Sequence, residues 1–237
     1  MDFENQEVIR DYYSSKEKAI SDVFFKVFGW MFIGLIVTAI TAFATASSPA
    51  LLGTIFSNNV YWIGLLIAEL VLVIVLTARI HKMSKTTATL MFLLYSLVNG
   101  LTLSTIFLVY DFGSISSVFF ITAAMFGVMA LYGYTTKKDL TKIGSILLMA
   151  LIGLIIASIV NIFWLNDTFS FIVAAIGVVI FVGLTAYDVQ KIKVMASEVG
   201  TENDFIEKFA IIGALTLYLD FINLFLKLLR LLGKSRD

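Results

Sequence analysis

The sequence predicts an all-α membrane protein with seven transmembrane helices. Hydrophobic residues make up 59% of the 237 residues and charged residues only 14%, so the polar surface of an ordinary soluble domain is missing. Seven stretches reach the roughly 20 apolar residues that a helix needs to cross a bilayer. The connections between these stretches are short, which predicts a single bundle.

The seven predicted helices follow one another without an intervening soluble domain. Turn-forming residues separate them, such as Ser48-Pro49 after the first helix and Asn58-Asn59 before the second. Because the chain has one proline, a break within a helix has to come from glycine or from a polar insertion. The predicted spans are residues 24–46, 61–80, 87–109, 115–134, 143–165, 169–190 and 209–232.

These spans divide the chain into three parts. Residues 1–23 carry charges of both signs and do not have the short basic region and cleavage site of a signal peptide. We interpret them as a polar cytoplasmic N-terminal tail. Residues 24–232 form the seven-helix transmembrane domain, and residues 233–237 form a short basic C-terminal tail.

Positive charges predict the orientation of the bundle. Cytoplasmic loops of membrane proteins carry an excess of lysine and arginine, and here these residues lie in the second, fourth and sixth connections. We therefore expect a cytoplasmic N-terminus and an outer C-terminus. The cations near the end of the chain disagree with this orientation unless they have partners: Lys227, Arg230, Lys234 and Arg236.

Composition excludes several classes of function. A net charge of zero leaves no basic face for nucleic acid. The absence of cysteine excludes disulfides and thiolate metal sites, and a single histidine excludes histidine-rich metal clusters. The sequence also contains no phosphate-binding loop, dinucleotide fingerprint or hydrolase motif. We therefore predict no resident cofactor and no enzymatic activity.

Ionisable residues within the predicted spans carry the functional signal. An ionisable residue at the centre of a spanning helix costs roughly 2.5 to 3.5 kcal/mol on insertion scales, so it is uncommon without a partner or a watery cavity. Glu69 and Arg79 lie in the second helix, Asp188 in the sixth and Asp220 in the seventh. We interpret the two aspartates as the working site.

The seventh helix carries a polar stripe. Residues at alternating steps of three and four lie on one helical face, and in this helix such a series is polar or small: Gly213, Thr216, Asp220, Asn223, Lys227, Arg230 and Lys234. A stripe of this kind is unfavourable against lipid, so we expect the helix to be central, with the stripe facing a pathway. The alternative is a seam of hydrogen bonds that holds helices together.

The charges of the second and seventh helices have matching spacing. Glu69 and Arg79 are ten residues apart, as are Asp220 and Arg230, which is about 15 Å along each axis. Since these two helices run in opposite directions, we expect Arg79 to meet the two aspartates on the inner side. Glu69 and Arg230 would then form a secondary ion pair on the outer side. In the alternative, Arg79 extends to the lipid headgroups and only marks the topology.

The aspartate pair predicts sensitivity to pH and an affinity for calcium. Two carboxyl groups close together in a low dielectric titrate as a unit, so acidification is expected to protonate the pair, release Arg79 and free the second helix to move. Asp188 and Asp220, with hydroxyl oxygens such as those of Thr185 or Thr216, are hard ligands suited to Ca²⁺. These oxygen ligands favour Ca²⁺ over Zn²⁺ as the ion that the pair would contact.

The last two helices resemble those of the Bax inhibitor-1 family, also called the transmembrane Bax-inhibitor-motif proteins. The resemblance rests on TAYDVQKI at residues 185–192, on LYLDFINLFL at 217–226 with Arg230 behind it, and on LYGYT at 131–135. Chain length, seven spans and a charged N-terminal tail agree with it. The resemblance covers nearly the whole chain.

The resemblance implies a central seventh helix surrounded by the other six, and a pH-dependent calcium leak that an aspartate pair and an arginine hold closed. These roles map onto Asp188, Asp220 and Arg79. The compact chain resembles a bacterial member, which places it in the plasma membrane, in contact with lipid. Some bacterial relatives are thought to modulate a membrane-anchored ATP-dependent protease, so regulation of such a partner is the alternative function.

A third possibility is an intramembrane aspartyl protease, because such enzymes also place one aspartate on each of two neighbouring late helices. Tyr187-Asp188 fits the first motif of that class. The second motif requires glycines before the aspartate for close approach of the substrate, whereas Asp220 follows Leu217-Tyr218-Leu219. This departure favours the ion pathway.

Overall fold

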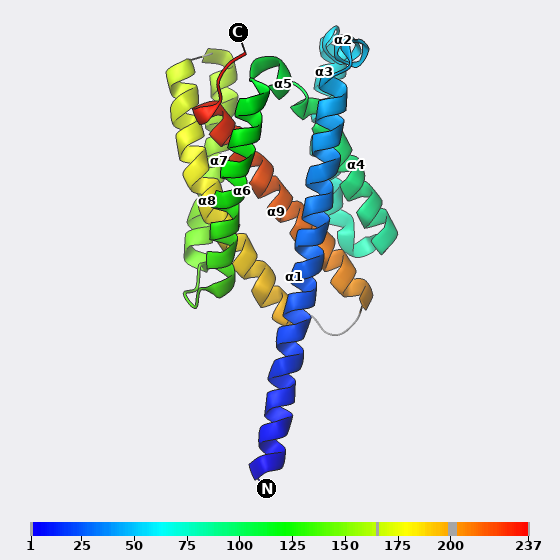
Figure 1. Cartoon of the computed structure of the whole chain (residues 1–237), viewed down its shortest axis with the longest axis vertical. Coiled ribbons are helices and arrows are strands. Elements are labelled where there is room, and N and C mark those ends of the chain that lie inside the picture. Colours follow the sequence, from blue (N-terminus) through cyan, green and yellow to red (C-terminus); the bar gives the residue numbers. More distant parts are fainter. Residues whose placement is uncertain (1, 165, 199–202, 237) are drawn as a thin grey trace.

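The computed structural model describes residues 2–164, 166–198 and 203–236. Seven long helices in these ranges are apolar enough to cross a membrane (Figure 1). They are α1 (Asp2–Ala46), α3 (Asn59–Arg79), α4 (Lys85–Leu103), α6 (Phe112–Thr135), α7 (Thr141–Trp164), α8 (Asp167–Glu198) and α9 (Asn203–Leu232). Three short helices lie in or beside the connections: α2 (Pro49–Phe56), η1 (Ile80–Lys82) and α5 (Ile106–Val109).

The seven predicted spans are confirmed. Within the described residues, each lies in one of the long helices, except that the second ends one residue into η1 and the third continues through a break into α5. Residues 1, 165 and 237, which belong to the predicted N-terminal tail, fifth span and C-terminal tail, lie outside the described residues. From Asp2 onward, the predicted N-terminal tail is the first part of α1, which extends well beyond the other helices (Figure 1).

Polar residues in the connections set where the helices begin. The side chains of Ser48, Asn58, Ser84 and Asp111 each accept a hydrogen bond from a backbone N–H in the first turn of the helix that follows. These bonds satisfy donors that a helix start leaves without partners. The same residues therefore end one span and begin the next helix.

The break after α4 comes from a polar insertion. The hydroxyls of Ser104 and Thr105 donate to the carbonyl oxygens of Leu101 and Thr102, at 2.6 and 2.9 Å. Such local bonds compete with the regular helical ladder. The third span therefore divides at residues 104–105, and neither of these is proline or glycine. Of the two causes that the sequence left open, glycine or a polar insertion, the structure shows the polar insertion.

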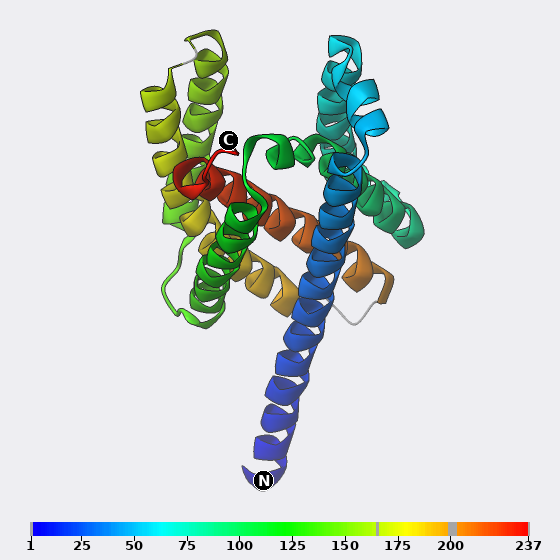
Figure 2. The ribbon, with the colours of Figure 1, turned by 45° about the horizontal axis from the view of Figure 1, so that its top comes forward.

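Helix α9 is the most buried of the spans, which confirms its predicted central position. Of its most apolar window, 72% of residues are buried, against 6 to 50% for the other six spans. It crosses the bundle obliquely (Figure 2) and packs against α1, α4, α6 and α8. Helices α3 and α7 are peripheral and pack mainly on α4 and α8.

The ends of the chain lie at opposite ends of the bundle (Figure 1). The lysine-containing connections between α3 and α4 and between α6 and α7 lie toward the end from which the N-terminal part of α1 projects, which agrees with the predicted orientation. Cations near the C-terminus have partners at the opposite end. The Arg230 guanidinium lies 2.7 Å from a carboxylate oxygen of Asp167, and Arg236 donates to the Phe107 carbonyl oxygen at 3.3 Å. These contacts account for positive charge at that end.

The C-terminal tail is attached to the start of α6. Ser235 forms an isolated antiparallel bridge with Tyr110, and the backbone N–H of Lys234 donates to the Ser114 hydroxyl at 2.9 Å. The N–H of Asp111 in turn donates to the Lys234 carbonyl oxygen at 3.1 Å. The tail therefore joins the end of α9 to the connection between α4 and α6.

Glycine allows α6 and α8 to approach closely. A Cβ atom added to Gly133 would lie 2.2 Å from the carbonyl oxygen of Ala186, which is a backbone contact that cannot give way. Small residues at helix contacts permit such packing in membranes. Since Ala186 is two residues before Asp188, this contact also sets the position of the segment of α8 that carries Asp188.

We expect Gly133→Ala to destabilise the protein. The added methyl group overpacks a backbone contact, a change that typically costs about 1 to 3 kcal/mol. Gly127→Ala on the same helix is the matched control, because no atom lies within 4 Å of a Cβ added there, and alanine is favoured over glycine by about 1 kcal/mol in a helix. Thermal unfolding in detergent should show a lower midpoint for Gly133→Ala than for Gly127→Ala. Equal midpoints would contradict this account of the contact.

Candidate functional site

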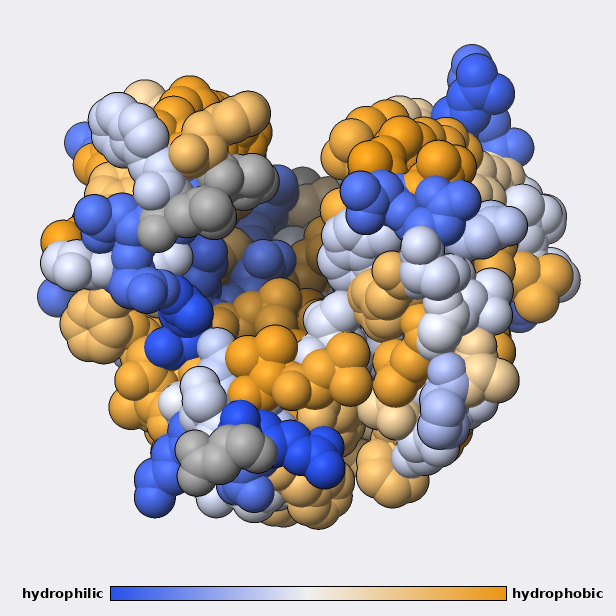
Figure 3. Space-filling view, turned by 90° about the horizontal axis from the view of Figure 1, so that it is seen from above, coloured by the Kyte–Doolittle hydropathy of each residue, from blue (hydrophilic) through white to orange (hydrophobic). Residues whose placement is uncertain are grey.

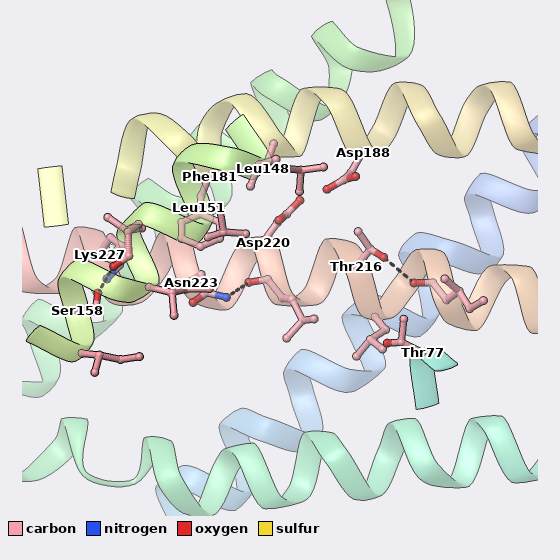
Figure 4. Close-up of a pocket in the computed structure, with 17 residues that line it drawn as sticks. Thr77, Leu148, Leu151, Ser158, Phe181, Asp188, Thr216, Asp220, Asn223 and Lys227 are labelled. Carbon is pink, nitrogen blue, oxygen red and sulfur yellow. Dashed lines mark hydrogen bonds between the residues drawn. The ribbon is translucent and has the colours of Figure 1, made fainter. Parts of the chain in front are cut away.

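Asp188 and Asp220 meet between α8 and α9. The two side chains point toward one another from their helices (Figure 4), and their carboxyl groups are close enough for each to affect the charge of the other. Asp220 is buried, with 5% of its surface exposed, whereas Asp188 is half-buried. The structure thus brings the two sequence-predicted aspartates together.

The segment around Asp188 is held on both sides. The ring of Tyr187 lies over Gly144 of α7, where an added Cβ would come within 2.3 Å of it. The side chain of Gln190 accepts a hydrogen bond from the Leu140 N–H and donates one to the Lys138 carbonyl oxygen, both at 2.8 Å. Neighbouring residues in the motif therefore anchor α8 to α7 and to the connection before it.

A hydrogen bond in the connection between α6 and α7 also stabilises the start of α7. Asp139 accepts a hydrogen bond from the Thr141 N–H at 2.9 Å. Hydrogen bonds from the Thr141 side chain and backbone lower the pKa of Asp139, so the carboxylate remains ionised at the positive end of the helix dipole. The two residues that bond to Gln190, Lys138 and Leu140, lie on either side of Asp139 in this turn.

The aspartate pair lines a cavity of about 540 Å³. Side chains of α7, α8 and α9 form most of its wall, and Thr77 contributes from α3. Seen from the C-terminal end, the molecule is deeply hollowed between its two halves, with hydrophilic residues on part of the wall (Figure 3). The polar members of the α9 stripe that line the cavity are Thr216, Asp220, Asn223 and Lys227.

The rest of the predicted stripe has other surroundings. Gly213 faces Val27 of α1 and Ile192 of α8, and Arg230 pairs with Asp167. The stripe therefore faces a cavity over its middle part, about two to three helical turns, and makes helix and tail contacts at its ends.

One oxygen of the aspartate pair has no protein partner. Oδ2 of Asp220 is buried and accepts no hydrogen bond from the described residues. A buried carboxyl group in this state is costly unless a proton or a cation satisfies it. The pair is therefore suited to hold a proton between its two carboxyl groups or to contact a passing cation.

The charges around the pair differ from those expected. Lys191, one turn along α8, is close enough to interact with the charge of Asp188. Arg79 is exposed at the end of α3 and forms no hydrogen bond or ion pair with any residue in the described ranges. The proposed contact of Arg79 with the aspartates is thus not made in this structure and stays a prediction.

The expected ion pair between Glu69 and Arg230 requires correction. Arg230 pairs with Asp167, and Glu69 accepts hydrogen bonds from the Asn99 amide at 3.3 Å and from the Thr102 hydroxyl. Because α3 packs along α4, the side chain of Glu69 meets α4 instead of the end of α9. Equal spacing of charges on two helices was not enough to bring those charges together.

A buried network continues from Glu69 to the opposite face of α9. Asn99 also accepts a hydrogen bond from the Tyr218 hydroxyl at 3.0 Å, and that hydroxyl lies 2.6 Å from the Thr38 hydroxyl. Tyr218 is fully buried. The network therefore joins α1, α3, α4 and α9 on the side of α9 that faces away from the aspartate pair.

Sequence reasoning missed Gln190 and Tyr218 as structural residues of the site. Both lie inside the two aspartate motifs, within two residues of Asp188 and Asp220, so their presence in the motifs was the available signal. Their partners, Lys138 and Leu140 in one case and Thr38 and Asn99 in the other, lie far away in the sequence. Only the tertiary contacts reveal what the two side chains do.

The site contains few ligands for a metal ion. In the described ranges no group of three or more histidine or acidic residues could hold a metal. Thr185 and Thr216 donate their hydroxyl hydrogens to carbonyl oxygens of their own helices, at 2.8 and 3.1 Å, and only Thr216 lines the cavity. Calcium normally takes six to eight oxygen ligands, so two carboxyl groups suit brief contact with a cation better than its storage.

The protein family described as "Inhibitor of apoptosis-promoting Bax1" matches residues 20–237. The chain belongs to the Bax inhibitor-1 family. It is 54% identical to the inner membrane protein YbhL of Escherichia coli over 213 residues, which cover 89% of this chain and 91% of YbhL. A Borreliella burgdorferi protein is 47% identical over 212 residues, covering 90% and 91% of the two chains.

More distant relatives of the family also match along their length. An uncharacterized membrane protein of Streptococcus pyogenes is 33% identical over 226 residues, covering 94% of this chain and 97% of its own. This Bax inhibitor-1 family member is thus a multi-pass membrane protein with seven spans and a homologue of a bacterial inner membrane protein. None of these three relatives is named as an enzyme.

We expect Gln190→Ala to loosen the connection between α6 and α7. The Leu140 N–H loses its acceptor, and a hydrogen bond of this kind contributes about 1 kcal/mol, so hydrogen exchange at Leu140 should become several-fold faster. Gln190→Glu is the matched control, because it keeps an acceptor for that N–H. Exchange measured by mass spectrometry should remain slow in Gln190→Glu; unchanged exchange in Gln190→Ala would contradict the role of this side chain.

Proposed function

We propose that the protein is a pH-sensitive calcium-permeable leak channel of the cell membrane. Asp188 and Asp220 line the ion path, and Arg79 is the latch that closes it. The observation that carries the proposal is the buried contact between these two carboxyl groups at the wall of a cavity. Ions cross without chemical change, so no catalytic residue is assigned.

Burial and charge support a role in cation passage. Asp220 lies in the most buried helix of the bundle, where ionisable residues commonly mark ion or proton pathways. The cavity provides space beside the carboxyl groups, and the unpartnered Oδ2 of Asp220 is a free acceptor. A site that binds cations weakly favours conduction, since an ion that binds too tightly does not leave.

The contact between two acids supports control by protons. Two carboxyl groups that touch away from water are stable together when they share a proton. When the pair is ionised, it attracts the guanidinium of Arg79; as the pH falls and the pair takes up protons, that attraction is lost. Acidification then releases α3 and raises the cation flux. The exposed Arg79 and the direct contact between the acids agree with the released arrangement.

The alternative of an intramembrane aspartyl protease shares the carboxyl pair. Such an enzyme needs space for a peptide next to its second aspartate. Here the residue directly before Asp220 is Leu219, whose side chain lines the cavity at the place where that class of enzyme has glycine. This packing favours ion passage. Cleavage of a single-span reporter that is lost in Asp220→Ala would instead support the protease.

We expect Asp188→Asn and Asp220→Asn to abolish the dependence of calcium flux on pH. The amide removes the titrating group but keeps the size of the side chain. Purified protein in liposomes with an enclosed calcium-sensitive dye should show wild-type flux that rises as the pH falls from 8 to 6, a window near the pH of the cytoplasm. The proposal fails if both variants keep the wild-type flux and its pH dependence.

We expect Arg79→Gln to increase calcium flux at neutral pH toward the acid level, because the ionised pair then lacks its latch. Lys82→Gln is the matched control, since it removes a positive charge from the same end of the bundle three residues further on. The liposome assay at neutral pH should show a several-fold increase for Arg79→Gln and wild-type flux for Lys82→Gln. Equal flux in both variants would reduce Arg79 to a marker of topology.

A further inference from the structure

A lysine lies in the same cavity as the aspartate pair. Lys227 is half-buried and lines the cavity together with Asp188 and Asp220. It follows Asp220 by seven residues on one helical face, about 10 Å along the axis of α9. Figure 4 shows Lys227 and Ser158 on one side of the cavity and the carboxyl pair toward the other.

The side chain of Lys227 packs against α8 at Gly177. A Cβ atom added to Gly177 would lie 3.0 Å from both Cγ and Cδ of Lys227. The absence of a side chain at Gly177 therefore lets the aliphatic stem of the lysine lie along α8. The stem packs in this way while the ammonium group remains at the cavity.

The ammonium group of Lys227 is not neutralised by a contact. In the described part of the chain, both ion pairs involve other residues, Lys26 with Glu207 and Arg230 with Asp167. Lys227 itself has no hydrogen bond to a described residue, and the polar neighbours that line the cavity beside it, Ser158 and Asn223, carry no charge. A positive charge thus faces the space next to the proposed ion path.

We infer that Lys227 is a selectivity-determining residue that opposes the passage of cations, and divalent cations most strongly. The inference rests on the proposed function, because it assigns a second charged group to the same path. Lys227 and the carboxyl pair have opposite effects on a cation, since the acids attract it at one level of the cavity and the lysine repels it at another.

The charge of the ion sets the size of the effect. Coulomb repulsion is proportional to the charge of the ion and is strong where little water screens it. Removal of the lysine charge therefore lowers the barrier for a divalent ion by twice as much as for a monovalent ion. If the monovalent flux rises about threefold, the divalent flux is expected to rise about ninefold, the square of that factor. A change in cavity size alone would not follow this relation.

The test compares Ca²⁺ and K⁺ fluxes of the full-length protein in liposomes at one pH. Lys227→Gln should raise both fluxes, Ca²⁺ more than K⁺, whereas Lys227→Arg should keep both near the wild-type values. Lys234→Gln is the matched control, because it removes the same charge seven residues further along the chain, in the tail beyond the end of α9 and outside the cavity lining. It should leave both fluxes unchanged.

The chain contains no cysteine, so Lys227→Cys introduces a single thiol that can be modified selectively. A reagent that attaches an aminoethyl group restores a positive charge there and should return both fluxes to the wild-type level. A neutral reagent of similar size should leave them raised. This comparison keeps the same folded protein throughout and separates charge from a structural effect of the substitution.

The outcomes separate the two proposals. Wild-type flux that is measurable but unchanged in Lys227→Gln, or raised equally for both ions, would overturn the role of Lys227 and leave the channel intact. Equal effects of the positive and neutral reagents would overturn it as well. Absence of cation flux in the wild type and in every variant would overturn the channel itself.

Discussion

The enclosure of Asp220 is the constraint on which the rest of the structure depends. Its helix, α9, has neighbours along most of its length and no broad face toward lipid or water. A carboxyl group there has to be satisfied by another protein group, by a proton or by an ion. Asp188 supplies a neighbouring carboxyl group, and the buried Oδ2 of Asp220 has no hydrogen-bond partner among the described residues. The need to place Asp188 at that point explains why α8 is held so firmly by Gly133, Tyr187 and Gln190.

The two faces of α9 have different surroundings. The face with Tyr218 is dry and closed, and its hydroxyl joins α1, α4 and, through Asn99, the Glu69 carboxyl group of α3. The face with Asp220 is the one that lines the cavity. The proposed response to protons requires this difference, because packing on one side and open space on the other would let local contacts change without disrupting the bundle. In the proposed channel, the central helix is therefore the support, and the peripheral helix α3 is the one that moves.

Some charged side chains of the bundle are paired with another charge, and others line the cavity. Arg230, near the C-terminal end, is paired with Asp167, while the middle of the cavity holds acids at one level and Lys227 at another. In the proposed channel, an arrangement of this kind would attract cations and still limit how fast they pass, because the two effects act at different depths. Of the basic residues that conflicted with the predicted orientation, Arg230 and Arg236 have local partners and Lys227 lines the cavity.

The sequence by itself determined the number and approximate limits of the spans, the central position of the last helix and the identity of the two aspartates. Hydrophobic length and the cost of a buried charge depend only on which residues are present, so no neighbour has to be known. Only the tertiary structure decided which side chains meet. Glu69 and Arg230 have matching spacing but lie on helices that are not packed together, and Gln190, Tyr218 and Lys227 owe their roles to residues far away in the chain. Contacts of this kind depend on the order and tilt of the packed helices, which periodicity along one helix does not contain.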